Sequence, residues 1–136
     1  MAALPRDWGV PELSETNEAW FTLGALTVQR CRACATRQHP PEEVCHACGA
    51  TDFDVDVLAP SGTVHSFTVV HHAANPALSA SVPYTVVLVS LDDAPELRVV
   101  GNLDGEVRIG MKVVPWWEER TADDGTLVRL PQWRPA

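Results

Sequence analysis

The sequence predicts a mainly β protein, in which an N-terminal helix leads into a zinc ribbon and then into a small C-terminal barrel of the OB type. Two observations carry this prediction. Two Cys-x2-Cys pairs lie close together within residues 31–48, and β-branched runs separated by turn residues follow them. The 136 residues, 46% of them hydrophobic, suffice for one packed domain or two very small ones. We therefore divide the chain into a tail and helix (1–26), a zinc ribbon (27–58) and an OB-fold (59–136).

Residues 14–26 have the pattern of a helix. Ser14 is a suitable N-cap residue, because its hydroxyl can accept a hydrogen bond from a free amide of the first turn. Trp20 and Leu23 form an apolar stripe at helical spacing, and Gly24 is a stop signal. We therefore expect a short amphipathic helix directly before the first cysteine pair.

The four cysteines follow the pattern Cys31-x2-Cys34-x10-Cys45-x2-Cys48. Two such tight turns can place four thiolates at tetrahedral corners, and a site filled by four thiols leaves no position for a reactive water. The pattern therefore predicts a structural Zn²⁺ site. Iron bound by four thiolates is the alternative metal, His46 is an alternative ligand within the second turn, and two disulfides are a less fitting arrangement because the x2 spacing is typical of metal sites.

The rest of the chain reads as β structure. Strict alternation of apolar and polar residues over 52–57 predicts a strand that links the ribbon to the barrel. Four or five short strands after it favour a closed barrel, because closure removes exposed strand edges. A long loop of small residues, 73–82, interrupts this series and is of a kind that is often functional. The predicted strands cover residues 63–72, 84–91, 97–103, 111–118 and 127–133.

The composition argues against several classes of function. The formal net charge is -8, so the chain lacks the basic surface that binding to nucleic acid needs. The N-terminus shows no basic stretch before an apolar run, and no apolar window reaches the roughly 18 residues of a membrane helix. We therefore expect a cytoplasmic protein with reduced thiols, which binds neither nucleic acid nor a membrane.

The sequence offers no catalytic group. Because the ribbon uses every cysteine, no thiol nucleophile remains, and there is no serine elbow, phosphate loop or dinucleotide fingerprint. His71 and His72 end a predicted strand, but neighbouring strand residues point to opposite faces and no orienting partner is evident. We therefore predict no catalytic residue in this chain.

Two features are candidates for contact with a partner. Trp116 and Trp117 fall in one predicted strand, so one ring should face inward and the other outward, where tryptophan is a common interface anchor. The second candidate is the junction of a strand with the long loop, and its residues are His71, His72, Asn75 and Pro76.

The order of these motifs resembles the DUF35 family, in which a rubredoxin-like zinc ribbon is joined to an OB-fold. The resemblance runs from about residue 14 to residue 120. It rests on Trp20-Phe21, Gly24-x-Leu26, Cys31-x2-Cys34, Pro40-Pro41, Cys45-x2-Cys48-Gly49, Ser61-Gly62-Thr63-Val64, the strand Phe67 to His71, Pro83-Tyr84, and Ile109-Gly110-Met111-Lys112-Val113.

The resemblance implies an accessory subunit of a thiolase-superfamily enzyme that handles acyl-CoA. The catalytic residues then lie on a lipid-transfer-protein type partner, in a heterotetramer of two plus two chains. The reaction implied is that of an aldolase or lyase, such as a retro-aldolase of steroid side-chain degradation, or else that of an acyltransferase. The alternative is a stand-alone module that binds acyl-CoA, for which Arg30, Arg32 and Arg37 are candidate phosphate contacts, although solvation or pairing with carboxylates is the more ordinary role for these arginines.

Overall fold

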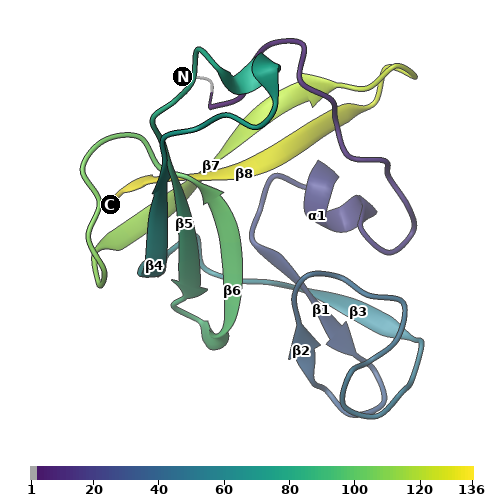
Figure 1. The fold of residues 1–136 in the computed structure, drawn as a ribbon. Helices are drawn as coiled ribbons and strands as arrows, with labels where there is room; N and C mark the ends of the chain where they lie inside the picture. The colour runs from purple at the N-terminus through teal and green to yellow at the C-terminus, as the bar shows by residue number, and fades with distance from the viewer. Residues whose placement is uncertain (1–2) are drawn as a thin grey trace.

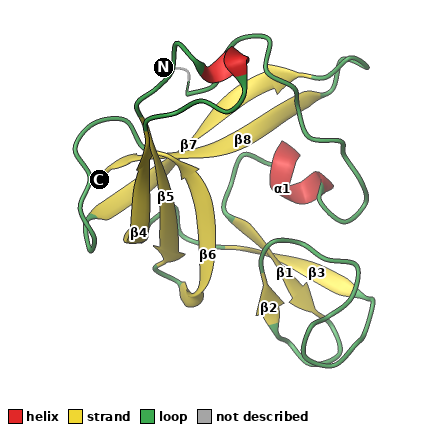
Figure 2. Ribbon diagram, viewed as in Figure 1, coloured by secondary structure: helices red, strands yellow, loops and turns green. Residues whose placement is uncertain are grey.

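The computed structural model describes residues 3–136, which form one short helix, one 3-10 turn and eight strands. Figures 1 and 2 show two separate sheets, with helix α1 (Glu18–Thr22) lying beside the smaller sheet and next to the long hairpin of the larger one. The mainly β class, the N-terminal helix and the cysteine ribbon predicted from the sequence are confirmed.

The smaller sheet belongs to the ribbon. Its strands are in the order β2-β1-β3, and both pairings are antiparallel. On the central strand, Gln29 lies opposite Gln38 on one side and Val55 on the other. The strands are β1 (Thr27–Cys31), β2 (Arg37–Gln38) and β3 (Phe53–Val57).

The larger sheet has five strands in the order β6-β5-β4-β7-β8. In Figure 1 the hairpin of β7 and β8 crosses the ends of the other three strands, as the two halves of a small barrel do. The 3-10 turn η1 (Pro76–Leu78) lies in the loop between β4 and β5. The strands are β4 (Gly62–Val70), β5 (Tyr84–Leu91), β6 (Ala94–Asn102), β7 (Lys112–Thr121) and β8 (Leu127–Pro135).

Within the described residues, the ladder of hydrogen bonds does not close into a full ring. Strands β6 and β8 meet at an isolated parallel bridge between Leu103 and Trp133. A side chain at Gly101 would place its Cβ 2.8 Å from Trp133 Cδ1 and 3.0 Å from the carbonyl oxygen of Pro131. Glycine therefore allows β6 to approach the buried Trp133 ring, and this contact holds the barrel together on one side.

Polar side chains complete the same junction. The backbone amide of Asn102 donates to Gln132 Oε1 at 2.6 Å, and Gln132 Nε2 donates to Glu118 Oε1 at 3.1 Å. Glu118 also accepts hydrogen bonds from the amides of Ala3 and Leu4 at 3.0 and 3.1 Å. The buried carboxylate therefore joins β7 and β8 and ties the N-terminal segment to the barrel.

One hydrophobic core extends from the ribbon into the barrel. Trp20 of α1 is buried. The centroid of its ring lies 4.5 Å from that of His39 in the ribbon and 5.5 Å from that of Trp117 in β7, and both contacts are edge-on. Leu26, just before β1, and Leu58, just after β3, belong to the same cluster. Because a single core includes both sheets, the ribbon and the barrel are packed together by α1.

The helix is shorter than the sequence predicted. Ser14 and Asn17 bond to each other, with the Ser14 amide donating to Asn17 Oδ1 and the Asn17 amide donating to Ser14 Oγ. This local pairing makes a turn of residues 15–17, so α1 begins at Glu18 and Ser14 is not its N-cap. Gly24, with φ +64°, follows the C-terminal end as expected of a stop signal.

The third predicted strand of the barrel also differs in its start. The predicted strand covers residues 97–103, but the turn before it takes only Asp92 and Asp93, so β6 begins at Ala94 and includes Pro95. Proline is tolerated there because β6 stands at the end of the sheet, where a missing amide donor interrupts no second ladder.

We predict that Trp20→Ala lowers the free energy of unfolding by about 3–5 kcal/mol, because it removes the ring that joins the ribbon to the barrel. Thermal and denaturant unfolding with the metal bound would measure the change. Leu23→Ala, at the C-cap of the same helix and 58% exposed, is the matched control and should change stability by less than about 0.5 kcal/mol. Equal effects of the two substitutions would contradict the role given to Trp20.

Candidate metal centre and partner surface

The two cysteine pairs lie in two turns with the same backbone geometry. In the first turn the amide of Cys31 donates to the carbonyl of Thr36 and the amide of Ala35 donates to that of Cys31. In the second turn the amide of Cys45 donates to the carbonyl of Ala50, and the amide of Gly49 donates to the carbonyl of Cys45. Ala35 and Gly49 hold equivalent positions, with φ of +63° and +79°. The repeated geometry directs two thiols from each turn toward one centre.

The four thiols meet as the spacing predicts. The Sγ atoms of Cys31, Cys34, Cys45 and Cys48 all lie within 4.8 Å of one another. The Cys31–Cys48 and Cys34–Cys45 sulfur pairs are 3.6 and 3.7 Å apart, close to the roughly 3.8 Å edge of a tetrahedron with Zn–S bonds of about 2.3 Å. The donor set therefore fits a structural metal ion. His46 is exposed, and the four sulfurs fill the tetrahedron without it.

The pKa values of the cysteines reflect how closely the four sulfurs approach one another. Hydrogen bonds with the side chain and backbone of Thr36 lower the pKa of Cys34 to about 6. The backbone amide of Ala50 lowers the pKa of Cys48, but hydrogen bonds with Cys31 and Cys34 outweigh it and raise that pKa to about 12. Thiols this close must share protons, and a divalent ion that replaces those protons allows all four to be thiolates.

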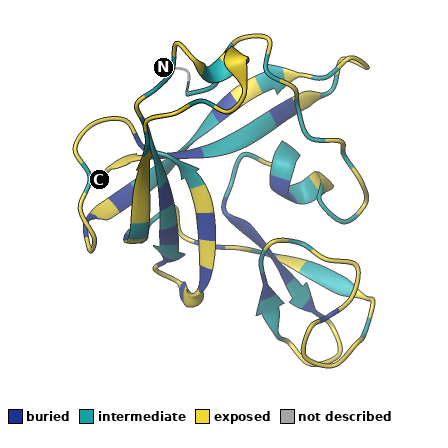
Figure 3. Cartoon of the chain, viewed as in Figure 1, coloured by how far each residue is buried: buried dark blue, intermediate teal, exposed yellow. Residues whose placement is uncertain are grey.

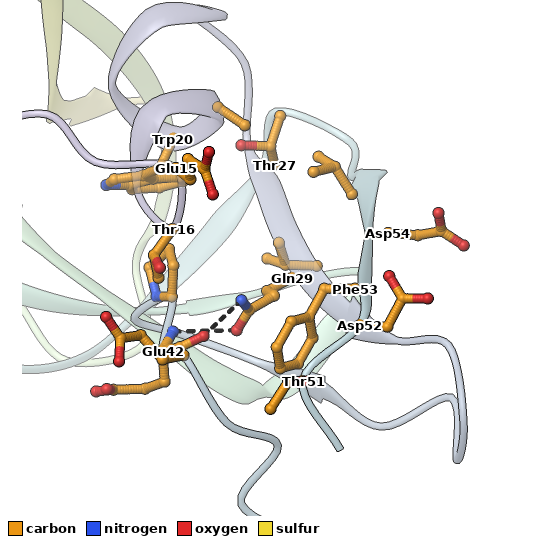
Figure 4. Close-up of a pocket in the computed structure, with 15 residues that line it drawn as sticks. Glu15, Thr16, Trp20, Thr27, Gln29, Glu42, Thr51, Asp52, Phe53 and Asp54 are labelled. Carbon is orange, nitrogen blue, oxygen red and sulfur yellow. Dashed lines mark hydrogen bonds between the residues drawn. The ribbon is translucent and has the colours of Figure 1, made fainter. Parts of the chain in front are cut away.

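Two buried glutamines position the second turn, and the sequence reasoning missed them. Gln38 Nε2 donates to Gln29 Oε1 at 2.7 Å, and the His46 amide donates to Gln38 Oε1 at 3.0 Å. Gln29 and Glu42 exchange hydrogen bonds of 2.7 and 3.1 Å, drawn as dashed lines in Figure 4. The signal was present as two glutamines in the short strands that flank the first cysteine pair, but polarity alone does not indicate burial.

The arginines named as phosphate contacts are paired with carboxylates. Arg30 lies 3.4 Å from Asp54 and 3.3 Å from Asp56, and Arg32 lies 2.8 Å from Asp54. Arg37 lies 3.6 Å from Glu96 of β6, a contact between the ribbon and the barrel. These side chains are therefore neutralised within the chain. The structure supports pairing with carboxylates as the role of the three arginines, rather than binding of CoA phosphates.

The hollow beside the ribbon is also acidic. It has a volume of about 480 Å³ and lies between α1, β1 and β3, as Figure 4 shows. A phosphate ligand would meet repulsion there, because the lining includes the carboxylates of Glu15, Glu42 and Glu43, which make no ion pair among the described residues. Asp52 and Asp54 also line it, but both pair with Arg32.

The two tryptophans predicted as partner contacts have different surroundings. The Trp117 ring faces inward against Trp20, so α1 covers it. Trp116 is half-buried and lines a second hollow, of about 350 Å³, at the end of the barrel with Ser81, Tyr84 and Asn102. One ring is thus enclosed by the fold, whereas the other stands at an opening. Contact of Trp116 with a partner stays a prediction.

The other predicted contacts lie on the surface next to that opening. His71 and His72 follow the end of β4, and both are exposed. Pro76 is exposed as the first residue of η1, and Asn75 caps this turn by accepting a hydrogen bond from the Ala77 amide at 2.9 Å. Asn75 therefore shapes the loop, and a role of these four residues in binding a partner stays a prediction.

No helix within residues 3–136 has both the length and the apolar character needed to cross a membrane.

Family models match most of the chain. The model described as the rubredoxin-like zinc ribbon domain of ChsH2 matches residues 22–54, and that of the ChsH2 C-terminal OB-fold domain matches residues 55–118. The matches divide the chain within β3, the strand that leads from the ribbon to the barrel.

Two relatives match almost the whole chain. A curated protein of Thermomonospora curvata named "Probable enoyl-CoA hydratase alpha subunit" is 37% identical over 131 residues. The match covers 93% of this chain but 39% of the relative, so this chain spans well under half of that protein. A solved structure described as "Ltp2-ChsH2(DUF35) aldolase" is similar with a TM-score of 0.74 and 39% identity, and the match covers 93% of this chain and 98% of that chain.

We predict that Gly49→Ala and Ala35→Gly, made as separate single substitutions, change the stability of the ribbon in opposite directions. A left-handed backbone costs a residue with a Cβ about 1–2 kcal/mol, so Gly49→Ala should destabilise the ribbon by about that amount although its Cβ would meet nothing within 4 Å. Ala35→Gly should stabilise it by about 0.5–1 kcal/mol after the entropy cost of glycine. Metal-release rates and thermal unfolding would measure both changes, and destabilisation by Ala35→Gly would contradict the equivalence of the turns.

We predict that His39 makes stability depend on pH. Burial lowers its pKa from 6.5 to about 4, and its Nδ1 is buried with no hydrogen-bond partner among the described residues. Between these values the unfolded chain binds more protons, so stability should be full above pH 6.5 and fall by up to about 3 kcal/mol toward pH 4. Acid also releases the metal, so the comparison is with His39→Phe, which should lose less stability over the same range. Parallel curves for the two proteins would contradict this role.

Proposed function

Because the chain belongs to the DUF35 family of ChsH2-type proteins, with its zinc ribbon and OB-fold, we propose that it is a non-catalytic accessory subunit of a thiolase-like acyl-CoA enzyme. The observation that carries this proposal is the likeness to the ChsH2 chain of an aldolase, which extends over nearly the full length of both chains at 39% identity. A likeness of this extent includes the ribbon, the barrel and the junction between them.

The inventory of side chains agrees with a supporting role. The thiols are gathered in one cluster that leaves no open coordination position, so the metal ion stabilises the ribbon and activates no water. We propose Zn²⁺ as the ion, bound by Cys31, Cys34, Cys45 and Cys48. The nucleophile and the general base of the reaction then belong to the partner, a lipid-transfer-protein type subunit of the thiolase superfamily.

We further propose that the complex is an aldolase that cleaves a carbon–carbon bond in a bulky acyl-CoA, that of a steroid side chain. The structural relative is named as an aldolase, and the curated relative as an enoyl-CoA hydratase subunit. A hydratase forms the β-hydroxyacyl group that a retro-aldol cleavage consumes, so the two activities act in sequence. We place the complex in the cytoplasm as a heterotetramer of two plus two chains.

The alternative of a stand-alone acyl-CoA module receives less support. The arginines of the ribbon are paired with carboxylates, and the hollow beside them is lined by acidic side chains. A CoA phosphate would therefore need basic groups from another chain. A catalytic subunit that supplies those groups makes direct contact with acyl-CoA by this chain unnecessary for the proposed function.

The proposal predicts that affinity purification of the tagged chain from its native cells recovers a thiolase-like protein in stoichiometric amount. Mass spectrometry would identify the partner, and aldol cleavage of acyl-CoA substrates would be measured for the partner with and without this chain. A chain that purifies alone, folded and loaded with zinc, would contradict the proposal, and titration with acyl-CoA would then test the stand-alone module.

The same complex tests the role of the metal. Cys31→Ser removes a buried ligand and should abolish zinc binding and complex formation, because the ribbon loses its main cross-link. Ala33→Ser, a matched change at an exposed position of the same turn, should retain both. Elemental analysis by mass spectrometry would count the ions and distinguish zinc from iron. A complex that persists after metal loss would show that the partner does not need an ordered ribbon.

A further inference from the structure

One long segment of the chain carries no formal charge. Residues 59–91 contain no Asp, Glu, Lys or Arg, although these residues make up 21% of the whole chain. The segment forms β4, the loop with η1, and β5. Much of it is exposed, as the upper part of β4 in Figure 3 shows. Exposed surface without charge is unusual for an acidic protein, and depletion of charged residues is typical of the centre of an interface.

The edge of β4 that faces away from β5 is open over half its length. On this side β4 pairs with β7 at Gly62 and Thr63, and Val64 makes the next hydrogen bonds, with Met111 and Gly110. A bulge follows at His65, and residues 66–70 continue past the start of β7. No strand within residues 3–136 pairs with this part of the edge, whereas β5 pairs with the other edge as far as Val70.

Apolar side chains of the core face extend onto this open part of β4. Phe67 lies opposite Val87, and side chains at paired positions share one face of a sheet. Val87 is fully buried, but Phe67 and Val69 on the same face are each 39% exposed, because β7 does not reach far enough to cover them. Val69 also lines the hollow of about 350 Å³ that Trp116 borders. The barrel therefore exposes part of its core beside an unpaired strand edge.

We propose that residues 66–70 of β4 are a docking site at which the thiolase-like subunit adds one extended segment to the barrel sheet. This inference rests on the proposed function for the identity of the partner. The added segment would take up the free amides and carbonyls of the β4 edge, and its alternate apolar side chains would cover Phe67 and Val69. Such a segment needs no charged side chains, because the surface that receives it has none.

The catalytic subunit fits this edge better than a second copy of the chain. Each copy carries a formal net charge of -8, so pairing two copies brings like charges together. A different chain need not carry the same net charge. The exposed His71 and His72 and the loop with η1 continue the same uncharged surface, so they can extend the contact beyond the added strand.

The test measures the affinity of the chain for the co-purified catalytic subunit by biolayer interferometry. Phe67→Glu places a carboxylate on the exposed part of the core face and should weaken binding by about tenfold or more. The matched control is Val100→Glu on β6, where the valine is 58% exposed, and it should bind like the wild type. Circular dichroism and zinc content would verify that both variants are folded.

Hydrogen–deuterium exchange of the wild-type chain supplies a measurement that needs no variant. Amides within residues 66–70 should exchange more slowly in the complex than in the free chain. The docking site is wrong if the complex forms, Phe67→Glu binds normally and these amides are not protected. The proposed accessory-subunit function would still stand in that case. If the catalytic subunit does not bind the wild type, both proposals fail. A dimer of the free chain in which these amides are protected would assign the edge to a second copy and overturn the inference.

Discussion

The packing of Trp20 between His39 and Trp117 is the contact on which the rest of the structure depends. The short helix that carries Trp20 makes few contacts of its own, and a helix of this length is not stable alone. It persists because Trp20 is buried between the two sheets and Phe21 packs against the same core. The same contact joins the core of a metal-held ribbon to the core of a barrel, so neither unit has to be complete by itself.

The two units are stabilised by different means. The ribbon is too small for a substantial apolar core, so it relies on four thiols around one ion and on two buried glutamines that hold the second cysteine turn in place. The barrel relies on apolar packing around Trp133 and on a polar junction at Glu118. On the side of β8 it is held together by the bridge between Leu103 and Trp133, and on the side of β4 it has a free edge, at which we propose that a partner docks.

The sequence allowed most of the metal centre to be predicted, because residues three apart in a tight turn converge without help from the rest of the chain. It allowed the strands to be placed within a few residues, because alternation is a local pattern. It failed at Ser14, where a side-chain pairing with Asn17 replaced the expected helix start. It also missed Gln29 and Gln38, because a glutamine in a strand has no feature that reveals burial. The lack of charge in residues 59–91 was visible in the sequence, but the free strand edge within this segment was not.

The sequence by itself determined the class of the fold and the four thiols of one site, since each follows from residue identity and short spacing. The tertiary structure alone decided which arginines are neutralised, which tryptophan is enclosed, and which edge of β4 is left free. Those outcomes depend on contacts between residues far apart in the chain, such as Arg37 with Glu96 or Trp20 with Trp117. Their geometry is set by the packing of whole elements, and no local pattern encodes it.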